Sequence, residues 1–174
     1  IVDEGDQVTL NGTGSTDNVG VVTYEWDLNT DGIYEEAGES INHTFLEPGT
    51  YPVELRVTDG VNLSQTDTVN VTVLDTTAPT ITAFTVSNPS EQKVTITFNS
   101  SEELAEIEVS ITGAENATLD ETDFNETGNF SYEASYDGGS DGTYTATLET
   151  AVDSDGNDAA AGKSDSVDID TTPP

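Results

Sequence analysis

Oxygen-bearing side chains alternate along two short acidic segments of this chain. The first runs Asp27-Leu-Asn29-Thr-Asp31-Gly32 and the second runs Asp153-Ser-Asp155-Gly-Asn157. Calcium takes about six to eight flexible oxygen ligands, and a glycine at the sixth position allows the sharp turn of a calcium loop. We therefore expect one calcium site at Asp27, Asn29 and Asp31 with Glu35 or Glu36, and a second at Asp153, Asp155 and Asn157.

The first segment has the spacing of the first half of an EF-hand loop, with Gly32 at the sixth position. Its twelfth position is Gly38, where an EF-hand needs a bidentate glutamate, so a complete EF-hand is excluded. The alternative to a looser calcium site is that Asp27 is purely structural and that acidic turns are simply abundant in this chain.

Asparagine sequons are the second chemical signal. Eight of the twelve asparagines begin an Asn-x-Ser/Thr sequence, namely Asn11, Asn42, Asn62, Asn70, Asn99, Asn116, Asn125 and Asn129. N-linked glycans need exposed acceptors, and strand phase points Asn70, Asn99 and Asn129 away from their apolar neighbours. We expect several of these sites to carry glycans; the alternative is chance enrichment in a Thr-rich chain.

Catalytic constellations are not evident in the sequence. The only histidine, His43, lies in an alternating segment, where packing is the expected role. With 35 acidic residues, a pair of carboxylates placed for glycoside cleavage carries no information. A nucleophile elbow and a phosphate-binding loop are also lacking, so we predict that the chain is not an enzyme.

Charge dominates the composition. The chain has 35 Asp and Glu against three Lys and Arg, which gives a net charge of −32 over 174 residues. Such self-repulsion opposes a compact state at ordinary ionic strength, but at molar salt the Debye length falls to about 3 Å. We therefore predict a protein from a halophilic organism; the alternative is a calcium-loaded acidic ectodomain from a marine or mesophilic one.

The same composition excludes several partners and cross-links. Arg56, Lys93 and Lys163 are too few to bind nucleic acid or an anionic membrane surface. The chain has no cysteine, which excludes disulfides and thiolate metal sites. Its apolar runs are far shorter than the roughly 20 residues that span a bilayer, so we expect no direct membrane insertion of this segment.

The elements that must position these groups are strands. Apolar and polar residues alternate with a period of two, and turn signals such as Pro48-Gly49 separate the alternating segments. This pattern predicts an all-β fold of antiparallel sandwiches. The alternating apolar positions are Val8 and Leu10; Tyr24, Trp26 and Leu28; Val53, Leu55 and Val57; Val69, Val71 and Val73; Val94, Ile96 and Phe98; Ile107, Val109 and Ile111; Tyr132, Ala134 and Tyr136; Tyr144, Ala146 and Leu148; Val167 and Ile169.

Two similar linkers predict the domain boundaries. Asp75-Thr-Thr-Ala-Pro79 and Asp170-Thr-Thr-Pro-Pro174 each follow a set of strands, as expected for tandem modules. We place the first domain at residues 1–75 and the second at residues 76–170. Residues 171–174 would begin a linker to a following module, so we expect an excerpt of a longer array.

Residues 1–75 resemble a polycystic-kidney-disease (PKD) repeat. The segments that carry the resemblance are Glu4-Gly5, Gly12-Thr-Gly-Ser15, Tyr24-Glu-Trp-Asp-Leu28, His43-Thr-Phe45, Pro48-Gly-Thr-Tyr51 and Val53-Glu-Leu-Arg-Val-Thr-Asp59. The family usually has Phe-Gly-Asp-Gly after Trp-Asp, whereas this chain has Leu28-Asn-Thr-Asp-Gly32, so that loop is expected to be reshaped.

Residues 76–170 look like the bacterial Ig-like modules of surface proteins. The matching segments are the Asp-Thr-Thr-Ala-Pro opening, Ser100-Ser-Glu-Glu-Leu104 and Val152-Asp-Ser-Asp-Gly-Asn157. Both resemblances imply non-catalytic, extracellular β-sandwich modules that act as spacers, adhesins or wall components.

We therefore expect a structural or adhesive segment of a haloarchaeal cell-surface glycoprotein, such as an S-layer, filament, stalk or adhesin. Its partners would be neighbouring repeats, copies of itself or other surface proteins. The alternatives are an accessory spacer of a secreted hydrolase, because PKD repeats often flank protease and chitinase domains, and a fibre or decoration protein of a halophilic virus.

Overall fold

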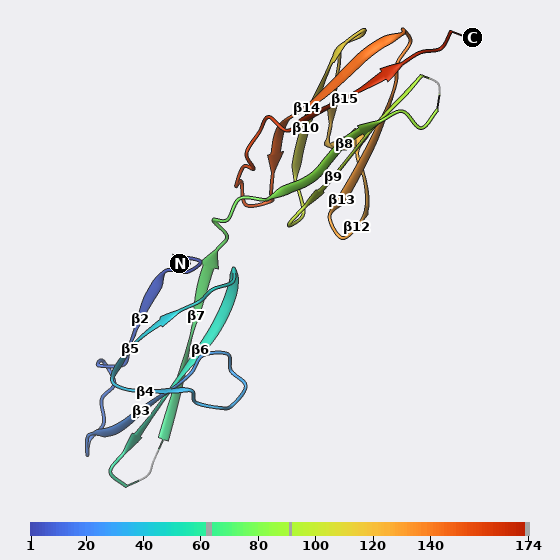
Figure 1. Cartoon of the computed structure of the whole chain (residues 1–174). Helices are drawn as coiled ribbons and strands as arrows, with labels where there is room; N and C mark the ends of the chain where they lie inside the picture. The colour runs from blue at the N-terminus through green and yellow to red at the C-terminus, as the bar shows by residue number, and fades with distance from the viewer. Residues whose placement is uncertain (62–63, 91, 173–174) are drawn as a thin grey trace. The chain divides into compact units, whose positions relative to one another are not determined.

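Two units make up the chain. The computed structural model describes residues 1–61, 64–90 and 92–172. It divides into Ile1–Thr76 and Thr77–Pro174 (Figure 1). Apart from a three-residue 3-10 helix, η1 (Glu121–Asp123), every regular element in these ranges is a strand. The predicted all-β fold with two sandwiches is confirmed.

The first unit pairs a five-stranded sheet with a two-stranded one. The larger sheet has the order β1-β7-β6-β3-β4, and the smaller sheet pairs β2 with β5. Only β1 and β7 pair in parallel; the other strand pairs of this unit are antiparallel. The strands are β1 (Val2–Asp3), β2 (Gln7–Asn11), β3 (Val21–Asp27), β4 (Glu36–Ala37), β5 (Ser40–Thr44), β6 (Gly49–Asp59) and β7 (Ser64–Leu74).

The core of the first unit is small and centres on Trp26. This side chain is 3% exposed, and its Nε1 donates a hydrogen bond of 2.9 Å to the carbonyl oxygen of Gly38. Both sheets contribute to the buried cluster, which comprises Leu10, Trp26, Leu28, Ile41, Phe45, Val53, Val71 and Val73. Strand alternation predicts that Val69 is buried together with Val71 and Val73. This prediction is wrong, because the Val69 side chain is 54% exposed.

The second unit packs two four-stranded sheets, with the orders β12-β13-β9-β8 and β11-β10-β14-β15. All its strand pairs are antiparallel. The strands are β8 (Ile81–Ser87), β9 (Lys93–Ser100), β10 (Glu106–Gly113), β11 (Ala117–Asp120), β12 (Asn125–Gly128), β13 (Ser131–Asp137), β14 (Gly142–Val152) and β15 (Ser164–Ile169).

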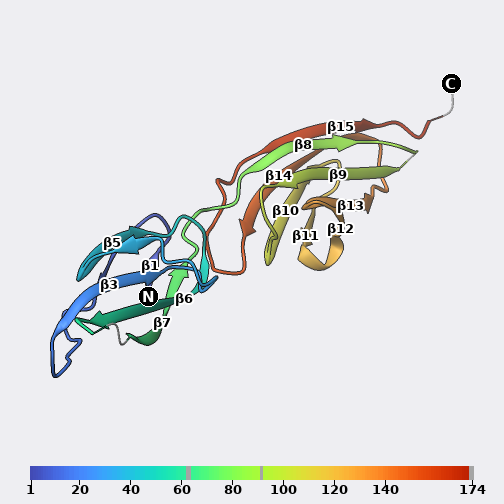
Figure 2. The ribbon, with the colours of Figure 1, turned by 90° about the horizontal axis from the view of Figure 1, so that it is seen from below.

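The core of the second unit is larger and follows the alternation of the sequence. The alternating residues Val94, Ile96 and Phe98 of β9 are at most 1% exposed, and the Phe98 ring stacks on Tyr132 at 5.3 Å between centroids. The edge strands β8 and β15 lie side by side (Figure 2). There the backbone N–H of Val86 donates to the Asp165 carboxylate at 2.8 Å, which joins the two sheets.

A substitution at Gly113 tests how closely the end of β10 packs against β14. Its φ is +133°, and a Cβ atom there would lie 2.0 Å from the Thr143 carbonyl oxygen. We expect Gly113→Ala to lower the free energy of unfolding of the second unit by about 2–3 kcal/mol, because backbone must move to relieve this clash. Urea denaturation followed by circular dichroism measures this change.

Gly128 provides the matched control, because its φ is +111° and a Cβ atom there would have open space for 4 Å around it. Gly128→Ala should cost only about 1 kcal/mol, from backbone strain without a clash. Equal destabilisation by the two substitutions would contradict the packing described for β10 and β14.

Candidate calcium sites and glycosylation sites

The loop between β3 and β4 is organised by its own carboxylate and amide side chains. Asp27 ends β3 and is 2% exposed; its two oxygens accept from the backbone N–H groups of Asn29 at 3.2 Å and Gly32 at 2.8 Å. The Asn29 Oδ1 accepts from Asp31 N at 2.9 Å, and Asp31 Oδ1 accepts from Ile33 N at 2.8 Å. These are successive Asx turns, the local bonding that Asp and Asn favour in tight loops.

These successive turns bring three carboxylates together. Oxygen atoms of Asp27, Asp31 and Glu35 all lie within 4.8 Å of one another. Asp31 and Glu35 are exposed, whereas Asp27 forms the buried base of the group. Glu35 is held in place because its Oε2 accepts from the backbone N–H of Leu28 at 2.9 Å. Three carboxylates at this spacing have the oxygen chemistry that calcium prefers.

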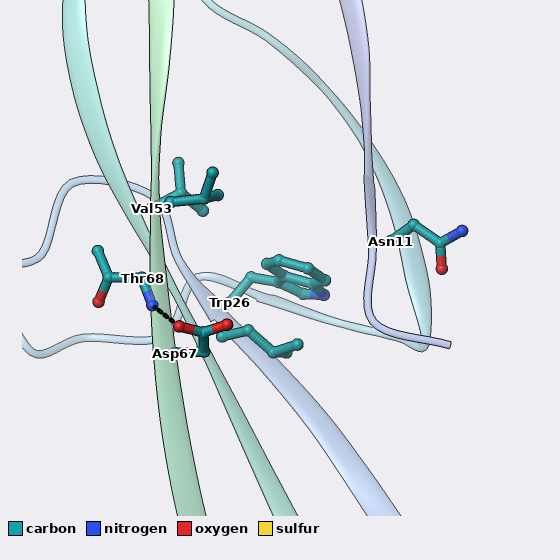
Figure 3. A pocket seen from close by; sticks show the side chains of 7 residues that line it. Asn11, Trp26, Val53, Asp67 and Thr68 are labelled. Atoms are coloured by element: carbon teal, nitrogen blue, oxygen red, sulfur yellow. Dashed lines mark hydrogen bonds between the residues drawn. The ribbon is translucent and has the colours of Figure 1, made fainter. Parts of the chain in front are cut away.

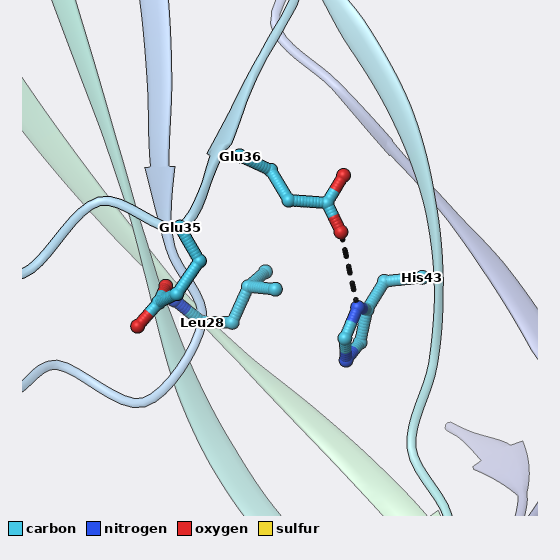
Figure 4. Close-up of polar contacts among 4 residues, drawn as sticks. All are labelled: Leu28, Glu35, Glu36 and His43. Carbon is cyan, nitrogen blue, oxygen red and sulfur yellow. Dashed lines mark hydrogen bonds and ion pairs between the residues drawn. The ribbon is translucent and has the colours of Figure 1, made fainter.

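Of the two glutamates expected as ligands, Glu35 lies in this group and Glu36 turns away. The Glu36 Oε1 lies 3.4 Å from Nδ1 of His43 on β5 (Figure 4). The His43 ring also packs edge-on against Phe45, with centroids 4.6 Å apart. His43 therefore has the packing role expected from the sequence.

Asp27 remains suited to hold a cation although it is buried. Burial by itself raises the pKa of this carboxyl group, but the backbone N–H groups of Gly32 and Asn29 outweigh that effect and the pKa is lowered. Hydrogen bonds to the charged form favour ionisation. Asp27 is therefore ionised at neutral pH without needing a basic side chain.

A cluster on β6 anchors the far end of the same loop. The Tyr34 hydroxyl donates to Glu54, and the Arg56 guanidinium carbon lies 3.8 Å from the centre of the Tyr34 ring. Arg56 also pairs with Glu25 of β3, with 2.9 Å between Nη2 and Oε2. The only arginine of the chain thus fixes the residue that precedes Glu35.

In the second loop, Asp153 is turned toward its own backbone. It is 4% exposed, and its Oδ1 accepts from the N–H groups of Asp155, Gly156 and Asn157 at 2.7–2.9 Å. Its Oδ2 accepts from Asn157 Nδ2 at 2.9 Å. These four hydrogen bonds make Asp153 the residue that organises this loop. The calcium role expected for Asp153 with Asp155 and Asn157 stays a prediction.

Glu102 is an acidic neighbour that the sequence did not single out as a ligand. Its carboxylate lies within 4.8 Å of that of Asp153, which is 51 positions further along the chain and in the same unit. Local spacing contains no signal for such a pair, because only the fold of the second sandwich brings the two segments together.

The sequons of the described residues are all exposed. This holds for Asn11, Asn42, Asn70, Asn99, Asn116, Asn125 and Asn129, whereas Asn62 lies outside the described residues. The Oδ1 atoms of Asn11, Asn42 and Asn116 accept hydrogen bonds from Thr13 N, Thr9 Oγ1 and Gly113 N. These bonds use the amide oxygen and leave out the nitrogen, to which a sugar would be linked.

Comparison with protein families identifies the first unit. Residues 1–73 match the family described as PKD domain. The first unit is a PKD domain. The Asp27–Gly32 loop is thus the place where this PKD domain departs from the usual Phe-Gly-Asp-Gly turn. No curated protein matches the chain.

Several solved structures align with most of this chain at low sequence identity and with TM-scores below 0.5. Fibronectin(III)-like modules of Clostridium thermocellum CbhA are 13% identical, with a TM-score of 0.36; the match covers 97% of this chain and 87% of theirs. The Bacteroides ovatus protein SGBP-B, solved with a mixed-linkage heptasaccharide, is 17% identical with a TM-score of 0.38; the match covers 98% of this chain and 42% of that one.

A complex of Dpr2 Ig1-Ig2 with DIP-Theta Ig1-Ig3 gives a TM-score of 0.43 at 13% identity, over 97% of this chain and 59% of that one. Likenesses this weak assign no ligand to the chain. The two four-stranded antiparallel sheets of the second unit themselves make it an Ig-like sandwich. Within the described ranges, no helix is long and apolar enough to cross a membrane.

Calcium should stabilise the PKD domain through Asp31 and Glu35. Extracellular calcium modules bind with Kd values of about 10⁻⁴–10⁻³ M, so about 10 mM Ca²⁺ should add about 1–3 kcal/mol to the free energy of unfolding. The D31N/E35Q variant should lose this gain. Fluorescence of Trp26, the only tryptophan, reports unfolding of this unit at fixed ionic strength.

The matched control is the D6N/E47Q variant, which neutralises two other exposed carboxylates of the first unit. It should keep the response to calcium, because neither residue lies in the Asp27, Asp31 and Glu35 group. Identical calcium responses of the two double variants would remove the case for a site in this loop.

Proposed function

We propose that this chain is a structural or adhesive segment of a cell-surface glycoprotein from a halophilic archaeon. PKD and Ig-like modules are non-catalytic and usually occur in extracellular proteins, either at the cell surface or as accessory parts of hydrolases. The observation that carries the halophilic, surface-exposed part of the proposal is the distribution of the carboxylates over the two units.

Nearly all described acidic side chains are in contact with solvent. Among the described residues, the buried acidic ones are Asp27, Asp59 and Asp153. Arg56 forms an ion pair with Glu25, and His43 contacts Glu36. With 35 acidic side chains against three Lys and Arg, pairing compensates little of the negative charge, and screening by concentrated salt would reduce the repulsion.

Exposed sequons support a glycoprotein. Asn42 lies on the outer side of β5, next to buried Ile41, and Asn70 lies on the outer side of β7, next to buried Val71. In the second unit, Asn99 and Asn125 lie on β9 and β12 of one sheet. Glycans at these positions would add to the hydrated surface without disturbing either core.

The role that fits these features is mechanical. Strands β6 and β7 are paired over ten residue positions, from Gly49 opposite Val73 to Thr58 opposite Ser64. Such ladders resist extension along the strands, and calcium in the β3–β4 loop would stiffen one end of the PKD domain. Neighbouring repeats, copies of the same protein or other surface proteins are the partners that we infer.

A second role, as a spacer in a secreted hydrolase, rests on the PKD match itself, because such domains are accessory parts of these enzymes. The two proposals share the fold and the acidic surface. They differ in what else the parent protein contains.

Peptide and glycopeptide mapping of the parent protein, purified from its source, tests the proposal. Further sandwich repeats and glycans on exposed sequons such as Asn42 and Asn70 are the expected result. A catalytic domain in the same polypeptide would favour the spacer role, and a parent with all its sequons bare would contradict the glycoprotein.

A further inference from the structure

A hollow on one side of the PKD domain reaches down to its core. It has a volume of about 270 Å³, and its lining includes Asn11, Trp26, Leu55, Asp67, Thr68 and Val69. In Figure 3, Trp26 lies between the strand that carries Asn11 and the strand that carries Asp67 and Thr68. A second hollow of about 330 Å³ shares Asn11, Leu55 and Asp67 with the first and also includes Gly14. We call the two hollows together the Asn11 groove.

The two strands that border the Asn11 groove are edge strands. In the described part of the chain, β2 pairs only with β5, and β7 has β6 on one side but β1 only at Val73 and Leu74 on the other. Val69 lines the groove and has the strand phase of Val71, which is 7% exposed, yet Val69 is 54% exposed. Exposed apolar surface of this kind marks a place where another group packs.

Asn11 places a glycosylation sequence at this groove. It begins the sequon Asn11-Gly-Thr13 and is exposed. Its Oδ1 accepts from the backbone N–H of Thr13 at 2.9 Å, which orients the side-chain amide whose nitrogen would carry a sugar. At Gly14, a Cβ atom would have no other atom within 4 Å, so the segment that follows Asn11 leaves open space beside the groove.

The lining of the groove suits a sugar chain. Sugar rings have apolar C–H faces and hydroxyl groups at their edges. Leu55 and Val69 provide apolar surface, and Asp67 provides a carboxylate, which can accept several hydrogen bonds. Pockets for small ligands have volumes of about 300–1,000 Å³ and combine a mainly apolar lining with a few polar groups. The two hollows therefore have the size and chemistry to hold sugar units.

We propose that the N-linked glycan of Asn11 folds back into the Asn11 groove and covers Val69. This inference rests on the proposed role as a glycoprotein. A glycan that is attached at the groove is present there at a high effective concentration, so weak contacts are enough to hold it.

An added β-strand fits the groove less well than a glycan does. Asp67 lines the groove at the open edge of β7, and its Oδ1 accepts from the backbone N–H of Thr68 at 2.9 Å. An inward-pointing acidic side chain at an edge discourages strand pairing. The glycan would add to this protection, because it keeps the edge of β7 and the exposed Val69 away from neighbouring molecules on a crowded cell surface.

Cysteine labelling tests the proposal, because the chain has no cysteine of its own. Val69→Cys is placed in the parent protein, produced in its source organism, with and without Thr13→Ala. Thr13→Ala removes the sequon but keeps Asn11 and the backbone N–H that its Oδ1 accepts. With the sequon intact, a maleimide should react about tenfold more slowly, which corresponds to about 1.4 kcal/mol in favour of the covered groove.

Two controls make the labelling specific. Thr72→Ala removes the sequon of Asn70, which neighbours Val69 in the sequence but lies on the outer side of β7, so the labelling rate should not change. Val22→Cys tests whether Thr13→Ala disturbs the fold, because Val22 is 65% exposed on β3. Its reaction rate should be the same with and without Thr13→Ala.

Glycopeptide mapping of the same preparations separates this inference from the proposed function. A bare Asn11 beside glycans on other sequons would overturn the inference and leave the glycoprotein intact, whereas bare sequons throughout would contradict both. A glycan on Asn11 with equal labelling in the presence and absence of Thr13→Ala would overturn the inference alone. Protection that is lost with Thr72→Ala, or that rises with protein concentration, would assign the cover to the Asn70 glycan or to a second copy and would also overturn it.

Discussion

Two small β-sandwiches carry 35 Asp and Glu side chains against three Lys and Arg. Repulsion among them opposes every compact arrangement of the chain, and the two cores must outweigh it. In the described residues, the carboxylates are kept at the surface and the few buried ones are surrounded by N–H donors. Asp59 is one example of a buried carboxylate that is stabilised in this way. It is 7% exposed and accepts a hydrogen bond from the backbone N–H of Val61 at 2.8 Å. Backbone dipoles thus take the role that basic side chains have in other proteins.

Hydrogen bonds from N–H groups to carboxylates also stabilise the loops. Asp27 and Asp153 each lose contact with water, yet hydrogen bonds from nearby N–H groups outweigh burial and lower the pKa of each. Glu115 follows the same rule at the surface, where Gly139 N–H and the hydroxyls of Ser140 and Tyr136 lower its pKa and join two loops of the second unit. Stability from these groups is present above their unfolded pKa values and is lost as the pH falls through the lowered folded values. Acid therefore removes the bonds that hold the loops, even as it reduces the repulsion.

Strand phase made the cores predictable, because residues such as Val94, Ile96 and Phe98 are buried by alternation alone. Val69 was predicted wrongly because burial also depends on what lies across from a strand, which a local pattern does not contain. The sequence similarly located the Asp27 loop but left Glu35 and Glu36 as alternatives, since their separation depends on where β4 begins and on His43 of β5. The pairing of Glu102 with Asp153 was unpredictable because it arises only when distant segments of the second sandwich meet. Spacing thus indicates short-range chemistry, and tertiary structure decides which groups take part.

Because the surface charge is uncompensated, we expect this fold to depend on concentrated salt. Thermal unfolding of the 174-residue chain in about 0.1 M and about 3 M KCl measures this dependence most directly. We predict a much lower midpoint, or an unfolded chain, at low salt and cooperative unfolding at high salt. Sucrose in place of the added salt should not restore the high midpoint, because it does not screen charge. Equal midpoints in the two KCl solutions would contradict a fold that depends on screening.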